Sequence, residues 1–156
     1  MYEFKKSLKR AGLICFGLSF FQAVIGFFPS LSLYFGAPEK LVENVYALIL
    51  ASFFVAGILF LFGLYALSGA GYIRRLPYLK PLLVFISAVF TLRGLLLIPE
   101  FLIVIKVWTV SIPVAPRFII FSIVSCFIAF LFIYGTVLGW HSFSTYPKKV
   151  SDQNPF

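Results

Sequence analysis

Charged residues are scarce in this chain, and acidic residues are the scarcest of them. Of the 156 residues, 12% are charged and only five are Asp or Glu. Soluble domains average about 25% charged and about 45–50% apolar residues. Here 62% of the residues are hydrophobic, which is more apolar surface than a soluble fold could bury. The composition therefore excludes an ordinary soluble domain and indicates that lipid covers much of the protein.

Residue types that often carry catalysis or bind metals are also few. His141 is the single histidine, and one histidine cannot supply the several ligands that zinc or haem b requires. Cys15 and Cys126 lie in apolar runs without Cys-x-x-Cys spacing, so we expect two small apolar thiols. The chain has no glycine-rich phosphate loop and no His-Glu-x-x-His. We therefore expect no cofactor and no metal site, and we identify no catalytic residue.

Long apolar runs make up most of the chain. The length of each run is close to that needed to cross roughly 30 Å of hydrocarbon, about 20 residues. The expected spans are residues 11–28, 45–70, 81–104 and 118–139. The sequence thus predicts an all-α fold, a polytopic integral membrane protein with one four-helix transmembrane bundle over residues 1–141. A polar tail, 142–156, follows it.

Two of these runs allow alternatives. The basic segment Met1–Arg10 and the apolar run after it are also typical of a signal peptide. This run is too long, however, and no small-x-small site closes it, so we expect a retained first span. Pro99 interrupts the third run. Residues 99–112 either extend that helix beyond a proline kink or lie at the outer interface.

The charges divide unequally between the two sides of the predicted bundle. The N-terminus, the Arg74–Lys80 loop and the tail carry nine basic and two acidic residues, whereas the other two loops carry three of each. The positive-inside rule then places both termini in the cytosol. We expect a multi-pass protein of the cell inner (plasma) membrane with anionic lipids against its cytosolic face. This partition accounts for the net charge of +8 without nucleic acid as a partner.

Arg93 stands inside the third apolar run, about 18 Å from its start at the helical rise per residue. A guanidinium at a bilayer centre costs about 2.5–3.5 kcal/mol and usually has an interior partner. Glu100 lies two turns further along the same helix face, and Gln22 has a matching depth of about 16 Å in the first span. The expected polar cluster comprises Arg93, Gln22, Glu100 or Glu43, and Ser125. It is a structural ion pair or a ligand site; the alternative is an Arg93 that snorkels to the outer headgroups.

Small residues recur on one face of several spans. Such stripes let helix backbones approach closely in lipid, where packing replaces the hydrophobic effect. The residues expected to pack in this way are Ser52, Ala56, Gly63, Gly135 and Gly139. The last two also form a Gly-x-x-x-Gly pair. They either pack helices within one bundle, which we favour, or join two copies in an oligomer.

These features leave three classes of function. The first is a small non-enzymatic membrane protein that acts as an accessory, sensor or assembly subunit in an oligomeric membrane complex, with copies of itself or another membrane protein as partner. The second is a small oligomeric channel or carrier for an anionic or amphipathic solute, with Arg93 at the binding site. The third is a lipid- or quinone-modifying enzyme that holds a head group with Arg93. We expect the first, since no extramembrane segment is large enough for an active site.

Overall fold

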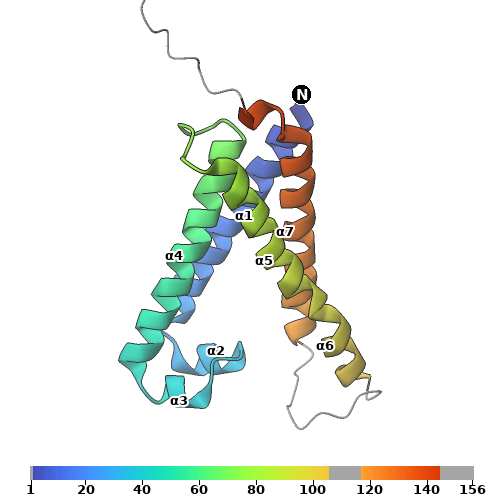
Figure 1. The fold of residues 1–156 in the computed structure, drawn as a ribbon. Helices are drawn as coiled ribbons and strands as arrows, with labels where there is room; N and C mark the ends of the chain where they lie inside the picture. The colour runs from blue at the N-terminus through green and yellow to red at the C-terminus, as the bar shows by residue number, and fades with distance from the viewer. Residues whose placement is uncertain (1, 106–116, 145–156) are drawn as a thin grey trace, which may run out of the picture.

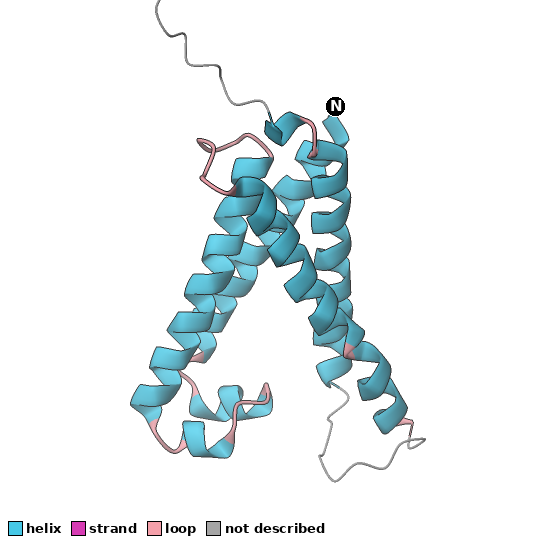
Figure 2. Ribbon diagram, viewed as in Figure 1, coloured by secondary structure: helices cyan, strands magenta, loops and turns pink. Residues whose placement is uncertain are grey.

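The structure is all-helical in the residues that it describes. It is a computed structural model that describes residues 2–105 and 117–144, and within these ranges it has no strand. Short loops connect the helices within the range 2–105 (Figure 2). The elements are α1 (Tyr2–Ile25), α2 (Pro29–Tyr34), α3 (Glu39–Val42), α4 (Val45–Gly69), α5 (Leu79–Leu95), α6 (Leu97–Val104), α7 (Arg117–Gly139) and the 3-10 turn η1 (Ser142–Ser144). The all-α prediction is confirmed.

Four helical stretches among the described residues are long and apolar enough to cross a membrane. They are Glu3–Ile25, Val45–Gly69, Leu79–Ile103 and Phe118–Gly139. Their order along the chain is that of the four expected runs. Residues 99–104 are helical, in agreement with the alternative in which the third helix continues beyond Pro99. Residues 106–112 lie outside the described part of the chain.

The first helix begins earlier than the sequence predicted. It starts at Tyr2 rather than near residue 11. Phe4 and Leu8 are buried while the neighbouring lysines stay exposed, and the Ser7 hydroxyl donates to the Leu131 carbonyl at 2.9 Å. The basic segment is therefore one face of a helix whose other face packs on α7, which hydropathy alone does not reveal.

The helices form two hairpins that meet at one end and separate at the other (Figure 1). The first hairpin consists of α1 and α4, with α2 and α3 in the connection between them; the second consists of α5, α6 and α7. The joined end holds the start of α1, the loop 70–78 and the end of α7. The splayed end holds α2, α3 and α6.

The hydrophobic core lies toward the joined end. Leu8, Leu83 and Phe132 are fully buried there, and the ring of Phe90 on α5 lies edge-on to that of Phe62 on α4 with centroids 6.0 Å apart. Large apolar side chains thus hold the two hairpins together where the helices converge.

Small residues bring α1 and α4 together within the first hairpin. A Cβ placed on Gly12 would lie 3.1 Å from the Gly63 carbonyl oxygen. The Ser19 hydroxyl donates to the Ala56 carbonyl at 2.7 Å. Ser52 and Ala56 are both buried. These small side chains leave room for the two backbones to approach, and one of the hydroxyls links the helices directly.

Gly135 and Gly139 of α7 are covered by α1. A Cβ on Gly135 would lie 2.6 Å from Leu8 Cγ, and a Cβ on Gly139 would lie 2.9 Å from Phe4 Cδ2. This glycine pair therefore packs helices inside one chain, and its face is occupied rather than open to a second copy.

One aromatic side chain spans the two hairpins at the splayed end. The ring of Phe35, directly after α2, has its centroid 5.4 Å from that of Phe21 on α1 and 5.6 Å from that of Phe121 on α7. Gly36 continues this turn with a φ of 95°, a conformation that glycine adopts at little cost. Residues 29–42, which lie between the first two expected spans, thus form α2 and α3 and reach the second hairpin.

Candidate functional site

Two backbone features bring the charged residues of the second hairpin together. The first is Gly94, directly after Arg93. A Cβ on Gly94 would lie 2.6 Å from Cys126 Sγ and 3.2 Å from Cys126 Cα. Since only a residue without a side chain fits there, α5 and α7 touch backbone to backbone. This contact places Arg93 beside the first turns of α7.

The second feature is the break between α5 and α6 at Leu96. Pro99 has no N–H to donate to the Leu95 carbonyl, and its ring crowds that carbonyl. α5 ends at Leu95, and α6 begins two residues later. In a straight helix, residues seven apart are separated by about 10.5 Å along the axis. Interrupting the helix between Arg93 and Glu100 allows these two side chains to meet.

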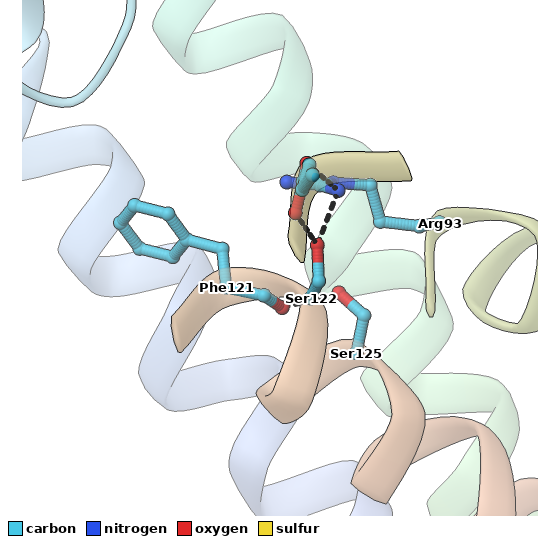
Figure 3. A network of polar contacts seen from close by, with 5 residues as sticks. Arg93, Phe121, Ser122 and Ser125 are labelled. Atoms are coloured by element: carbon cyan, nitrogen blue, oxygen red, sulfur yellow. Dashed lines mark hydrogen bonds and ion pairs between the residues drawn. The ribbon is translucent and has the colours of Figure 1, made fainter. Parts of the chain in front are cut away.

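Arg93, Glu100 and Ser122 form a closed set of contacts, which we call the Arg93 network; Figure 3 shows it from close by. Arg93 Nη1 donates to Glu100 Oε1 at 3.1 Å and to Ser122 Oγ at 2.8 Å. The Ser122 hydroxyl in turn donates to Glu100 Oε2. Each member contacts the other two, so the network links α5, α6 and α7 at one point.

The network is partly shielded from its surroundings. Ser122 is fully buried, and the side chains of Glu100 and Arg93 are 14% and 34% exposed. A largely buried carboxylate without partners would be costly, but here Glu100 accepts from a guanidinium and from a hydroxyl. The two opposite charges cancel. Within the described residues, Nε and Nη2 of Arg93 make no hydrogen bond.

The other residues predicted for this cluster lie outside the network. Gln22 is on α1, in the first hairpin, and no hydrogen bond joins it to Arg93 in the described part of the chain. Glu43 follows α3 in the first hairpin and is exposed. The Ser125 hydroxyl donates to the Phe121 carbonyl of its own helix at 2.8 Å (Figure 3). Whether the cluster serves as a ligand site stays a prediction.

Ser122 is the member of the network that was missing from the predicted cluster. It lies one turn before Ser125, closer to the start of α7. An Arg93 side chain that extends toward Glu100 reaches this turn of α7 rather than the next. The position of Glu100, two turns after Arg93, was therefore the signal in the sequence, because it sets the direction in which Arg93 extends. Depth measured from the Arg93 Cα alone pointed to Ser125 instead.

Neither a metal-ligating cluster among the described residues nor a similar protein indicates a function for this site. Among the described residues, no group of three His, Cys, Asp or Glu side chains could hold a metal ion. Comparisons with protein-family models, with curated proteins and with solved structures find no match to this chain. The fold and the Arg93 network are therefore the basis on which a function can be argued.

Proposed function

We propose that this chain is an integral protein of the cell inner (plasma) membrane, with four spans and both termini in the cytosol. Four apolar helices of sufficient length support insertion. The joined end gathers the start of α1, the loop 70–78, the start of α5 and the end of α7 (Figure 1), and with them most of the basic residues that the structure describes. The positive-inside rule supports a cytosolic joined end. The splayed end then faces away from the cytosol.

Within that membrane we propose a non-enzymatic role, as an accessory, sensor or assembly subunit of an oligomeric membrane complex. The observation that carries this proposal is the Arg93 network. An arginine within the membrane is costly and usually marks a function. Here Glu100 and Ser122, from its own hairpin, engage the guanidinium. The network thereby supports the positions of α5, α6 and α7 on the side of the molecule where the hairpins separate (Figure 1).

The surface that the network supports suits a partner helix. Leu92, Leu95 and Ile98 of α5 and α6 are 67%, 54% and 60% exposed. Association of helices in lipid depends on close packing of complementary surfaces. A helix that is broken at Leu96 could bend by different amounts. An apolar surface whose shape varied in this way would pack poorly against a partner helix. By fixing this bend, the Arg93–Glu100 pair keeps one apolar shape available to another copy or to a second membrane protein.

Native mass spectrometry of the protein purified in a mild detergent tests this proposal. We expect a complex of defined stoichiometry, and a loss of about tenfold in its association constant for Arg93→Ala, which corresponds to about 1.4 kcal/mol. The matched control is Ser125→Ala, because among the described residues that hydroxyl bonds only to its own helix. A wild-type protein that stays monomeric, or an Arg93→Ala variant that assembles as fully as the wild type, would contradict the proposal.

A second candidate is a small oligomeric channel or carrier for an anionic or amphipathic solute. The observation that favours it is the 34% exposure of the Arg93 side chain, together with Nε and Nη2, two donors outside the network's hydrogen bonds in the described residues. The adjacent Glu100 weakens it, because its charge opposes an anion. Measuring the flux of a small anion from liposomes tests this candidate. Flux that Arg93→Met abolishes would support the candidate, and a wild type without flux would exclude it.

A further inference from the structure

An open groove of about 730 Å³ lies at the joined end, between the loop 70–78 and the first turn of α5. Leu76, Leu79 and Phe143 contribute apolar side chains to its wall, and Arg75 and Lys80 contribute positive charge. The volume is in the range of about 300–1,000 Å³ that is typical of small-molecule sites. The groove thus combines an apolar wall with two cations from the same short segment.

Contacts with residues that follow α7 anchor both cations. Arg75 Nη2 donates to the Ser142 carbonyl at 3.3 Å. Lys80 Nζ lies 4.8 Å from the centroid of the Trp140 ring, a favourable cation–π arrangement. The positions of these charges are therefore set by the protein before any ligand arrives, unlike those of lysines that extend freely into solvent.

The loop that forms one wall of the groove is also held in place. The Ser68 hydroxyl donates to the Arg74 carbonyl at 3.2 Å and accepts from the Leu76 amide at 2.9 Å. At the entry to α5, Tyr78 adopts a φ of 55°, which is uncommon for a residue other than glycine. Such outliers persist where surrounding structure enforces them, and they cluster at functional sites. The wall is a built feature rather than a loose loop.

We propose that this groove binds one anionic phospholipid, with the phosphate between Arg75 and Lys80 and an acyl chain along Leu76, Leu79 and Phe143. The site rests on the proposed insertion with the joined end in the cytosol. There it lies at the level of the headgroups, where lysine, arginine and aromatic rings are favoured. A soluble phosphate would use the cations but not the apolar wall. A lipid uses both.

General attraction of the basic surface for a negative membrane is the competing explanation. Lys6 and Arg10 are exposed on α1 near the same end of the molecule, and they do not line the groove. Diffuse attraction acts on every cation of this face alike. A site acts through Arg75 and Lys80 in particular. Removing two charges at one place or the other therefore separates the two explanations.

The experiment is native mass spectrometry of the full chain in a non-ionic detergent, titrated with phosphatidylglycerol or phosphatidylcholine of the same acyl chains. The variants are Arg75→Gln/Lys80→Gln and the control Lys6→Gln/Arg10→Gln. We expect the wild type and the control to bind one phosphatidylglycerol in preference to phosphatidylcholine. The groove variant should bind it about tenfold or more weakly, since it lacks both cations that would attract the phosphate.

Two outcomes would overturn the site. One is equal loss of phosphatidylglycerol binding in the groove variant and the control, which would indicate diffuse attraction. The other is displacement of the lipid by glycerophosphate at equal concentration, which would show that the acyl chain contributes nothing. Carbonate extraction of membranes that contain the wild type tests insertion separately. A wild type that carbonate releases would contradict the proposed function itself, whereas a retained protein without a lipid preference would contradict only the site.

Discussion

The two hairpins are held together by different chemistry. In the first, α1 beyond Arg10 and all of α4 lack charged residues, and the helices meet through glycines, small side chains and the bond from Ser19 to Ala56. The second adds an arginine and a glutamate at its contact. The hairpin that contains the charge pair is also the one whose helix is interrupted. α4 is unbroken from Val45 to Gly69, whereas the helix of Arg93 is interrupted.

A broken helix needs a restraint that a continuous helix does not. Pro99 removes a backbone hydrogen bond at the junction of α5 and α6. The Arg93–Glu100 bond joins the two pieces across that junction, and Ser122 ties both to α7. The comparison indicates that the charges compensate for the break, and the following substitutions test that interpretation.

The largest effect is expected at the closest backbone contact of the second hairpin. Gly94→Leu must separate α5 from α7, because even a Cβ would lie 3.2 Å from Cys126 Cα. We expect a destabilisation of about 3 kcal/mol, measured by thermal unfolding in detergent. The control is Gly57→Leu on α4, where a Cβ would meet nothing within 4 Å. Equal effects of the two substitutions would contradict a tight contact at Gly94.

The charge pair is expected to show strong coupling. Arg93→Met leaves Glu100 without its cation, and Glu100→Gln leaves Arg93 without its anion. Each should destabilise the protein by about 2 kcal/mol, less than the 3–5 kcal/mol of fully buried pairs because Arg93 is partly exposed. The double variant should recover most of this loss. A double-mutant cycle in urea or by heat measures the coupling, and additive losses would show that the pair does not act as a unit.

The hydroxyls of the two hairpins provide a direct comparison at smaller magnitude. Ser122→Ala removes bonds to two charged groups and should cost about 1.5 kcal/mol. Ser19→Ala removes one neutral bond to the Ala56 carbonyl and should cost about 0.6 kcal/mol. Ser125→Ala serves as control. If Ser19→Ala proved the more damaging, hydroxyls rather than charges would dominate helix association in both hairpins.

At the joined end we expect a gain in stability rather than a loss. The Thr136 hydroxyl of α7 is buried and has no hydrogen-bond partner among the described residues. Thr136→Val keeps the shape and removes this polar group, so we expect stabilisation of about 1 kcal/mol. The readout is the midpoint of thermal unfolding. A lower midpoint would mean that the hydroxyl has a partner and that this contact is not purely apolar.

The sequence predicted the parts of this structure that depend on composition and on spacing along one helix. Apolar runs indicated four long helices. The seven-residue spacing of Arg93 and Glu100, with Pro99 between them, indicated that a bent helix could pair them. Contacts within one element follow from helical geometry, which a sequence contains directly.

Contacts between elements were harder to predict. Gln22 and Ser125 were chosen by depth, but depth does not tell which hairpin a helix joins or where a hydroxyl points. Residues 29–42 gave no sign of folding back to α7, because that contact rests on the ring of Phe35 and on a turn at Gly36. The separation of the hairpins also has no periodic signature, since it reflects which large side chains meet in the core.

The measurement that tests the central claim most directly is the native mass of Arg93→Met/Glu100→Gln, compared with each single variant and the wild type. If the Arg93 network supports a surface used in assembly, the neutral pair should replace the charged one. The double variant should then form the same complex as the wild type, while the single variants dissociate. A double variant that loses the complex, together with an anionic small molecule that the wild type carries, would contradict this account. Arg93 would then bind a ligand instead of supporting its hairpin.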